Sequence, residues 1–211
     1  TDRFPELAQL CDFLPPGTVI DGEVLAWDRA GEMPLSFARL QPRIGRKTVP
    51  KKLLTEAPAI LMAYDLLEWG GADWRDRPLR ARRAQLEAAI ADLPLEVPIR
   101  LSARVGAADW SDLAEARARS RDLGAEGLML KRLSAPYLAG RKKGDWWKWK
   151  VDPLTIDAVM IYAQAGSGRR ATLYTDFTFA VWNGPPEKGD LVPFTKAYSG
   201  LTDAEFRQIT A

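Results

Sequence analysis

Residues 144–153 read GDWWKWKVDP, with three tryptophans and two lysines in five consecutive positions. Alternate residues of a β-strand face opposite ways, so Lys148 and Lys150 would share one face of a strand at this place. Their charges repel each other unless an anion lies between them, and a phosphate group meets that requirement. Trp147 and Trp149 would share the other face, where we expect them to fix the strand in a core. The alternative is an edge strand that its lysines protect from pairing.

The size of the chain and its hydropathy set the limits on the fold. With 211 residues and 46% hydrophobic content, we expect one or two domains. The apolar stretches are too short to span a membrane, and the first residues lack the pattern of a signal peptide. These features predict a cytoplasmic protein with no membrane partner.

Two residue types restrict the chemistry. Cys11 is the single cysteine, so it cannot form an internal disulfide, and we expect it to be a small buried residue. Histidine is absent, which excludes Ser/His/Asp and Cys/His nucleophile systems. Carboxylates, lysines and a bound metal remain for any reaction.

The first part of the chain alternates strand and helix patterns. Its β-branched or apolar runs predict four strands, at residues 18–27, 58–69, 126–133 and 145–151. Apolar residues at helical spacing predict helices within 78–93 and 108–124. Asp109 is in position to cap the second helix, and Gly124 follows its end.

The composition changes after residues 151–153, which read VDP. Two strand patterns, at 155–164 and 170–182, flank a turn and predict a β-hairpin, and residues 191–198 predict a third strand. Thr202 and Glu205 have the spacing of a helix capping box. Three antiparallel strands and a helix are typical of the opening of an OB barrel. We therefore predict an α+β fold with antiparallel sheets and flanking helices, divided into domains at 1–152 and 153–211.

A basic segment lies between the first two predicted strands. The net charge of +2 indicates no general affinity for nucleic acid, so local clustering has to supply one. Residues 34–54 carry six cations and no acid: Arg39, Arg43, Arg46, Lys47, Lys51 and Lys52. They form either a solvated helical surface or a surface that follows a phosphate backbone.

Three carboxylates lie on the predicted strands at positions suited to metal binding. Asp21 and Glu23 fall on one face of the first strand, and Glu126 enters another strand beside Gly127. Carboxylates from different strands, together with lysines, suit a Mg²⁺–phosphate site, because Mg²⁺ takes one or two carboxylates, water and phosphate oxygens.

Taken in order, four motifs resemble those of the covalent nucleotidyltransferases, and specifically of the ATP-dependent DNA ligases. They are DGE at 21–23, MAYDLL at 62–67, EGLMLK at 126–131 and WKWK at 147–150. The segment after residue 152 resembles the start of the ligase OB domain. Within the family the chain is most similar to the bacterial multidomain type, on the basis of residues 137–150 and 191–202. The fold implied is an adenylation domain followed by a partial OB barrel.

The resemblance implies a role for each motif residue. Tyr64 would stack on one face of adenine, with Met129 on the other. Glu23 would bind the ribose or assist the metal, and Glu126 would hold the metal beside the α-phosphate. Lys148 and Lys150 would bind that phosphate.

The resemblance also implies roles for four further cations and for Asp65. Lys131 and Arg141 would contact phosphate or DNA, and Lys142 and Lys143 would contact DNA. Asp65 would be structural. The cofactors implied are ATP and Mg²⁺ or Mn²⁺, and the partner is nicked double-stranded DNA.

The implied reaction has three phosphoryl transfers: a lysine attacks ATP to give lysyl-AMP, AMP moves to a 5′-phosphate, and a 3′-hydroxyl displaces it. The resemblance implies a monomer in the cytoplasm, associated with the nucleoid. The K-x-D-G motif that carries the nucleophilic lysine is absent, since the only Asp-Gly pair is Asp21-Gly22. The closing basic motif of the OB domain is absent too. We therefore expect a ligase fragment that is inactive in self-adenylylation.

Two other functions stay open at this point. An RNA ligase or a capping-type guanylyltransferase would share the motifs. A non-catalytic nucleic-acid-binding module would use residues 43–52 and 140–150 as its basic surface.

Overall fold

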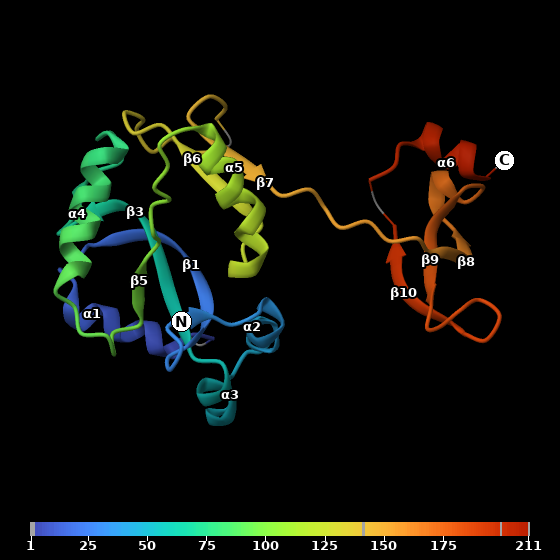
Figure 1. Cartoon of the computed structure of the whole chain (residues 1–211), viewed down its shortest axis with the longest axis horizontal. Coiled ribbons are helices and arrows are strands. Elements are labelled where there is room, and N and C mark those ends of the chain that lie inside the picture. Colours follow the sequence, from blue (N-terminus) through green and yellow to red (C-terminus); the bar gives the residue numbers. More distant parts are fainter. Residues whose placement is uncertain (1–2, 141, 199, 211) are drawn as a thin grey trace. The chain divides into compact units, whose positions relative to one another are not determined.

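The computed structural model describes residues 3–140, 142–198 and 200–210. The chain divides into two units, Thr1–Val151 and Asp152–Ala211 (Figure 1). Sheets of mainly antiparallel strands with flanking helices make this an α+β fold, as the sequence predicts. No helix in the described part of the chain is long and apolar enough to cross a membrane.

The main sheet of the first unit is built on two long strands. β1 (Val19–Asp28) and β3 (Ala59–Trp69) pair antiparallel, which confirms both predicted strands. Two short strands, β2 (Met33–Pro34) and β4 (Ala72–Asp73), extend the sheet, and β5 (Ile99–Leu101) pairs parallel with β3.

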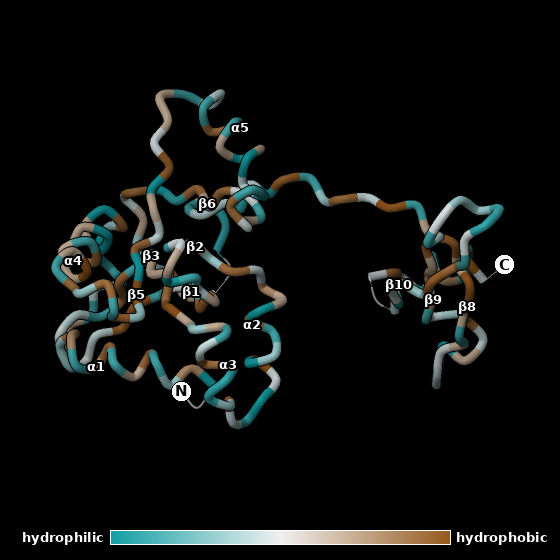
Figure 2. The backbone as a smooth tube through the Cα atoms, turned by 60° about the horizontal axis from the view of Figure 1, so that its bottom comes forward, coloured by the Kyte–Doolittle hydropathy of each residue, from teal (hydrophilic) through white to brown (hydrophobic). Residues whose placement is uncertain are grey.

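Helix α4 (Leu79–Ala91) covers one face of this sheet, in the place that its apolar spacing predicts. The core between them contains five buried side chains from β3, α4 and the segment of β5: Ala63, Leu66, Leu86, Val97 and Ile99. Figure 2 shows β5 as a mainly hydrophobic segment beside α4. Burial of these apolar side chains fixes α4 against the strand that carries Tyr64 and Asp65.

The basic segment forms two short helices, α2 (Phe37–Ile44) and α3 (Lys51–Glu56). The interpretation of Arg43 as a surface cation is wrong, because its side chain is fully buried. Its guanidinium forms two bonds to the Glu6 carboxylate, at 2.7 and 2.8 Å, and donates to the Ala57 carbonyl oxygen at 2.6 Å. A bidentate partner and a carbonyl compensate for the loss of water around the charge. The other five cations of the segment are exposed.

Glu6 belongs to the first elements of the chain, the 3₁₀-helix η1 (Pro5–Gln9) and the single turn α1 (Leu10–Phe13). Cys11 on α1 is exposed, so the prediction of a buried cysteine is wrong. Leu10 packs against the core, and the next residue of a helix points about 100° away from it.

In the residues that the structure describes, the second sheet of this unit has two strands. β6 (Gly127–Lys131) and β7 (Trp146–Lys150) confirm the strands predicted at 126–133 and 145–151, and they pair antiparallel with each other. α5 (Trp110–Ala118) and the 3₁₀-helix η2 (Arg119–Leu123) precede them. Asp109 caps α5 by accepting from two backbone amides, and Gly124 ends η2 with a φ of 67°, which confirms both signals.

The prediction that Trp147 is buried is wrong, because 47% of its surface is exposed. Trp149, on the same side of β7, contacts the Trp110 ring of α5 at 5.9 Å and lies under the Arg117 guanidinium. A two-stranded sheet needs cover from other elements, and α5 provides it for Trp149 and not for Trp147.

The described residues of the second unit form a three-stranded antiparallel sheet with one α-helix and one 3₁₀-helix. β8 (Val159–Ala165), β9 (Tyr174–Trp182) and β10 (Leu191–Ala197) lie in the order β10-β9-β8, so the predicted hairpin and third strand are confirmed. The 3₁₀-helix η3 (Gly168–Arg170) lies in the turn and delays the start of β9.

Helix α6 (Asp203–Thr210) closes over this sheet by stacking Phe206 on Phe177. The capping box is confirmed, since the Thr202 amide donates to Glu205 and the Glu205 amide donates to the Thr202 hydroxyl.

Candidate functional site

A β-bulge places Tyr64 within the main sheet. Asp21 pairs with Asp65 and Gly22 pairs with Ala63, so Tyr64 is the extra residue of β3. A side chain at position 22 would come within 2.8 Å of the Met62 carbonyl oxygen, so only glycine allows this approach. Bulges re-aim side chains and are frequent beside functional sites. The glycine of the DGE motif therefore serves the geometry of the neighbouring strand.

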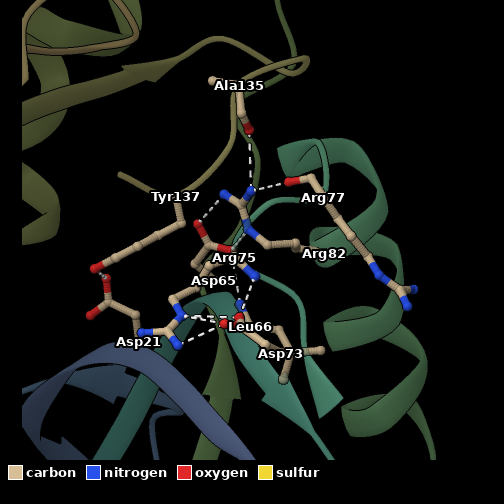
Figure 3. Close-up of polar contacts among 9 residues, drawn as sticks. All are labelled: Asp21, Asp65, Leu66, Asp73, Arg75, Arg77, Arg82, Ala135 and Tyr137. Carbon is tan, nitrogen blue, oxygen red and sulfur yellow. Dashed lines mark hydrogen bonds and ion pairs between the residues drawn. The ribbon is translucent and has the colours of Figure 1, made fainter. Parts of the chain in front are cut away.

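Asp21 holds two tyrosine hydroxyls. Its carboxylate accepts from the Tyr64 hydroxyl at 3.0 Å and from the Tyr137 hydroxyl at 2.8 Å, the second of which is drawn in Figure 3. Burial, together with the Asp21 charge, raises the pKa of Tyr137 to about 12 and raises the pKa of Tyr64 well above its usual value. Both phenols therefore remain neutral donors at physiological pH.

Lys131 lies between two aromatic rings from different strands. Its Nζ is 4.1 Å from the centroid of Tyr64 and 4.0 Å from the centroid of Trp146. Burial lowers the pKa of this lysine, and the Asp65 and Asp21 carboxylates oppose that effect. An ammonium group over ring faces gains cation–π attraction in place of lost water.

Beneath Tyr64, Asp65 forms a fully buried ion pair with Arg82 of α4. The two bonds measure 2.8 and 2.9 Å, and both side chains have no exposed surface (Figure 3). The same guanidinium donates to the carbonyl oxygens of Arg77 and Ala135. The structural role predicted for Asp65 agrees with this geometry.

The two lysines of the WKWK motif differ in their surroundings. Lys150 Nζ is 2.6 Å from a carboxylate oxygen of Glu126, and Lys148 is exposed opposite Met129. The bond from Lys150 is the main cause that lowers the pKa of the Glu126 carboxyl. In this structure the anion beside Lys150 is thus a carboxylate.

Gly127 allows Glu126 to reach Lys150. Its φ is 141°, and a side chain there would collide with the Trp149 carbonyl oxygen. The backbone therefore turns at the first residue of β6, a conformation that glycine adopts readily.

The structure brings Tyr64, Lys131 and Asp65 into one neighbourhood. It places Met129, Lys148 and Lys150 on the β6–β7 sheet, with Glu126 just ahead of β6 and paired with Lys150. Glu23 is exposed on β1. Lys142 and Lys143 are exposed in the loop before β7, and Arg141 lies outside the described residues.

Glu126 and Glu23 are the carboxylates that the sequence predicts for a magnesium ion. The described residues contain no group of three or more His, Cys, Asp or Glu side chains arranged for a metal. Mg²⁺ does not require one, since it is commonly held by one or two carboxylates with water and substrate phosphate. Both carboxylates are exposed, and that of Glu126 is paired with Lys150.

Sequence reasoning missed Trp146 as a neighbour of Lys131 and Tyr137 as a partner of Asp21, and it gave Asp21 no role beyond a possible place beside a metal. Their contacts join segments far apart in the chain. One usable signal was Gly22, because a glycine inside a strand pattern suggests a bulge or a close backbone approach.

Comparison with known proteins identifies the family. The protein-family model described as "ATP dependent DNA ligase domain" matches residues 1–150 of this chain. A probable DNA ligase of Koribacter versatilis is 33% identical, over 99% of this chain and 39% of the relative. A DNA ligase of Halorubrum lacusprofundi is 35% identical, over 100% of this chain and 34% of the relative. The chain thus spans little more than a third of each of these curated relatives.

A solved structure supports the fold. The structure described as "DNA binding with a minimal scaffold: Structure-function analysis of Lig E DNA ligases" aligns with a TM-score of 0.59 and 21% identity. The alignment covers 90% of this chain and 64% of that one. With the family model matching most of its length, this chain belongs to the ATP-dependent DNA ligase family.

Proposed function

We propose that the first unit is the ATP-binding part of an adenylation domain and that the second is the start of an OB domain. The proposal rests on the contact between Tyr64 and Lys131, which belong to two separate sheets. The Lys131 Nζ lies 4.1 Å from the centroid of the Tyr64 ring. The main sheet supplies an aromatic ring that can stack on a base. The β6–β7 sheet supplies cations that can bind phosphates.

In this proposal Tyr64 and Met129 bind the adenine, and Lys148 and Lys150 bind the α-phosphate. Glu126 and Glu23 hold Mg²⁺ or Mn²⁺, which supplies charge neutralisation on the phosphate oxygens. Lys150 exchanges Glu126 for phosphate when the nucleotide enters. Lys131 contacts phosphate from its place between the rings.

The whole protein would seal nicks in double-stranded DNA through lysyl-AMP and DNA-adenylate, in the cytoplasm and at the nucleoid, as a monomer. The exposed cations of α2 and α3, together with Lys142 and Lys143, support contact with a DNA backbone. Such a ligase would serve replication, recombination and repair.

The lysine pair provides the test of this function. Lys148→Ala and Lys150→Ala should each weaken ATP binding to the 211-residue chain about 10- to 100-fold, because each removes a charge-assisted phosphate contact. Adenosine binding should stay unchanged. Isothermal titration measures both, with Lys188→Ala, an exposed lysine of the second unit, as the control. Equal ATP affinity in wild type and both variants would refute the assignment.

Tyr64 provides a second prediction. Tyr64→Ala should weaken ATP binding more than Tyr64→Phe, since stacking needs the ring. Tyr64→Phe should still cause a measurable loss, because the hydroxyl bond to Asp21 fixes the ring plane. ATP titration of the two variants decides: a phenylalanine variant as weak as the alanine variant would show that the hydroxyl matters and stacking does not.

A further inference from the structure

The residues that would bind ATP lie on two sheets. Glu23 and Tyr64 belong to the five-stranded sheet, whereas Lys131, Lys148 and Lys150 belong to the β6–β7 pair. In the part of the chain that the structure describes, the two sheets share no strand pairing. Side chains and loops must therefore fix the distance between the base wall, which carries Tyr64, and the phosphate wall, which carries Lys148 and Lys150.

The loop between β6 and β7 makes this connection through its backbone. The amides of Leu79 and Arg80 donate to the carbonyl oxygens of Ala135 and Leu133, both at 2.9 Å. Ala135 is 2% exposed, and its carbonyl oxygen also accepts from the buried Arg82 guanidinium (Figure 3). These bonds anchor the loop to the start of α4.

Tyr137 extends the connection into the site itself. Its amide donates to the Arg75 carbonyl oxygen at 2.8 Å, and its hydroxyl donates to Asp21 on β1 at 2.8 Å. Its ring meets Trp146 of β7 edge to face, at 5.4 Å between centroids. Tyr137 thus contacts β1 through its hydroxyl and β7 through its ring.

We propose that Tyr137, acting through Asp21, is a positioning residue that sets the separation of the two walls for a ligand that spans both. The identity of that ligand, ATP, rests on the proposed function. Asp21 also holds the Tyr64 hydroxyl, so a single carboxylate aligns the stacking ring with the strand that carries Lys148 and Lys150. Lys131 between Tyr64 and Trp146 is held by the same arrangement.

The separation of the two walls affects a ligand that contacts both of them, and it does not affect a ligand that contacts one. Binding of the second end of ATP is intramolecular once the first end is bound, so its contribution depends on the geometry of the two sites. Adenosine uses the base wall, and tripolyphosphate uses the phosphate wall. Loss of positioning should therefore weaken ATP binding and leave the two partial ligands unaffected.

The test uses the 211-residue chain and isothermal titration with ATP, adenosine and tripolyphosphate in Mg²⁺. Tyr137→Phe should weaken ATP binding about tenfold, as for loss of a hydrogen bond to a charged group, with changes of at most about twofold for the other ligands. Asp21→Asn, which also disturbs the bond to the Tyr64 hydroxyl, should weaken the binding of ATP and of adenosine and leave tripolyphosphate binding unchanged. For ATP, the double variant should be no weaker than the weaker single variant. Tyr162→Phe, at a tyrosine of the second unit that is 57% exposed, is the matched control.

Equal losses for all three ligands would show a general structural role and overturn the proposal, and so would additive losses in the double variant. A wild-type chain that binds none of the ligands would contradict the proposed function instead. In that case the positioning role of Tyr137 is tested by reacting the chain with an amine reagent and measuring the labelling of Lys131 by mass spectrometry. Tyr137→Phe should loosen the two rings and raise the labelling of Lys131 relative to Lys188 at least about threefold; unchanged labelling would overturn it.

Discussion

Replacing Arg82 with methionine should lower the free energy of unfolding of the first unit by about 3–5 kcal/mol, because it leaves the Asp65 charge buried and unpaired. Both partners are fully buried, and Arg82 also holds two carbonyl oxygens. Urea denaturation followed by tryptophan fluorescence measures the loss, since seven of the eight tryptophans lie in this unit.

Arg80→Met is the matched control, because Arg80 is exposed on the same helix, and it should change the free energy of unfolding by less than about 0.5 kcal/mol. A second variant, Asp65→Leu combined with Arg82→Met, should recover part of the loss, since buried ion pairs are often replaceable by apolar residues. A loss below about 1 kcal/mol for Arg82→Met alone would contradict the buried pair.

Local features of the fold were predictable because their causes are local. Asp109 and the pair of Thr202 and Glu205 cap helices through amides within three residues, so spacing alone identifies them. The strands β1 and β3 follow from their apolar runs. The α4 helix follows from the spacing of Leu79, Leu86 and Ile90.

Errors arose where burial depends on partners distant in sequence. Arg43 is buried because Glu6 reaches it from the start of the chain, and no pattern within residues 34–54 indicates that partner. Trp147 is 47% exposed, whereas the Trp149 ring packs against Trp110 of α5. Charge and hydropathy of a residue do not reveal which element packs over it.

In the candidate site, too, the residues in sequence motifs were predictable and the contacts between distant segments were not. Tyr64, Lys131, Glu126, Lys148 and Lys150 were selected from motifs, and the structure places them on two sheets of one unit, with Glu126 just ahead of β6. The Glu126–Lys150 pair and the bonds from Tyr64 and Tyr137 to Asp21 were not foreseen. They depend on a bulge and on a loop whose path the sequence does not disclose.

The second large effect concerns covalent chemistry. The 211-residue chain should form no covalent AMP adduct, because none of its lysines lies in a K-x-D-G context. Lys131 is held between two rings, and Lys150 is paired with Glu126. A lysine that is not in line with the leaving pyrophosphate loses most of the rate advantage of proximity, which reaches several orders of magnitude. Nucleotide binding without transfer is the expected behaviour.

Incubation with α-labelled ATP and Mg²⁺, followed by denaturing electrophoresis and peptide mapping, tests the account most directly. The 211-residue chain should carry no label, and a longer chain with a K-x-D-G segment ahead of Thr1 should carry it on the lysine of that segment. In the longer chain, Lys148→Ala and Lys150→Ala should abolish the label. Stable labelling of a lysine within the 211 residues, or an unlabelled longer chain that binds ATP, would contradict the account.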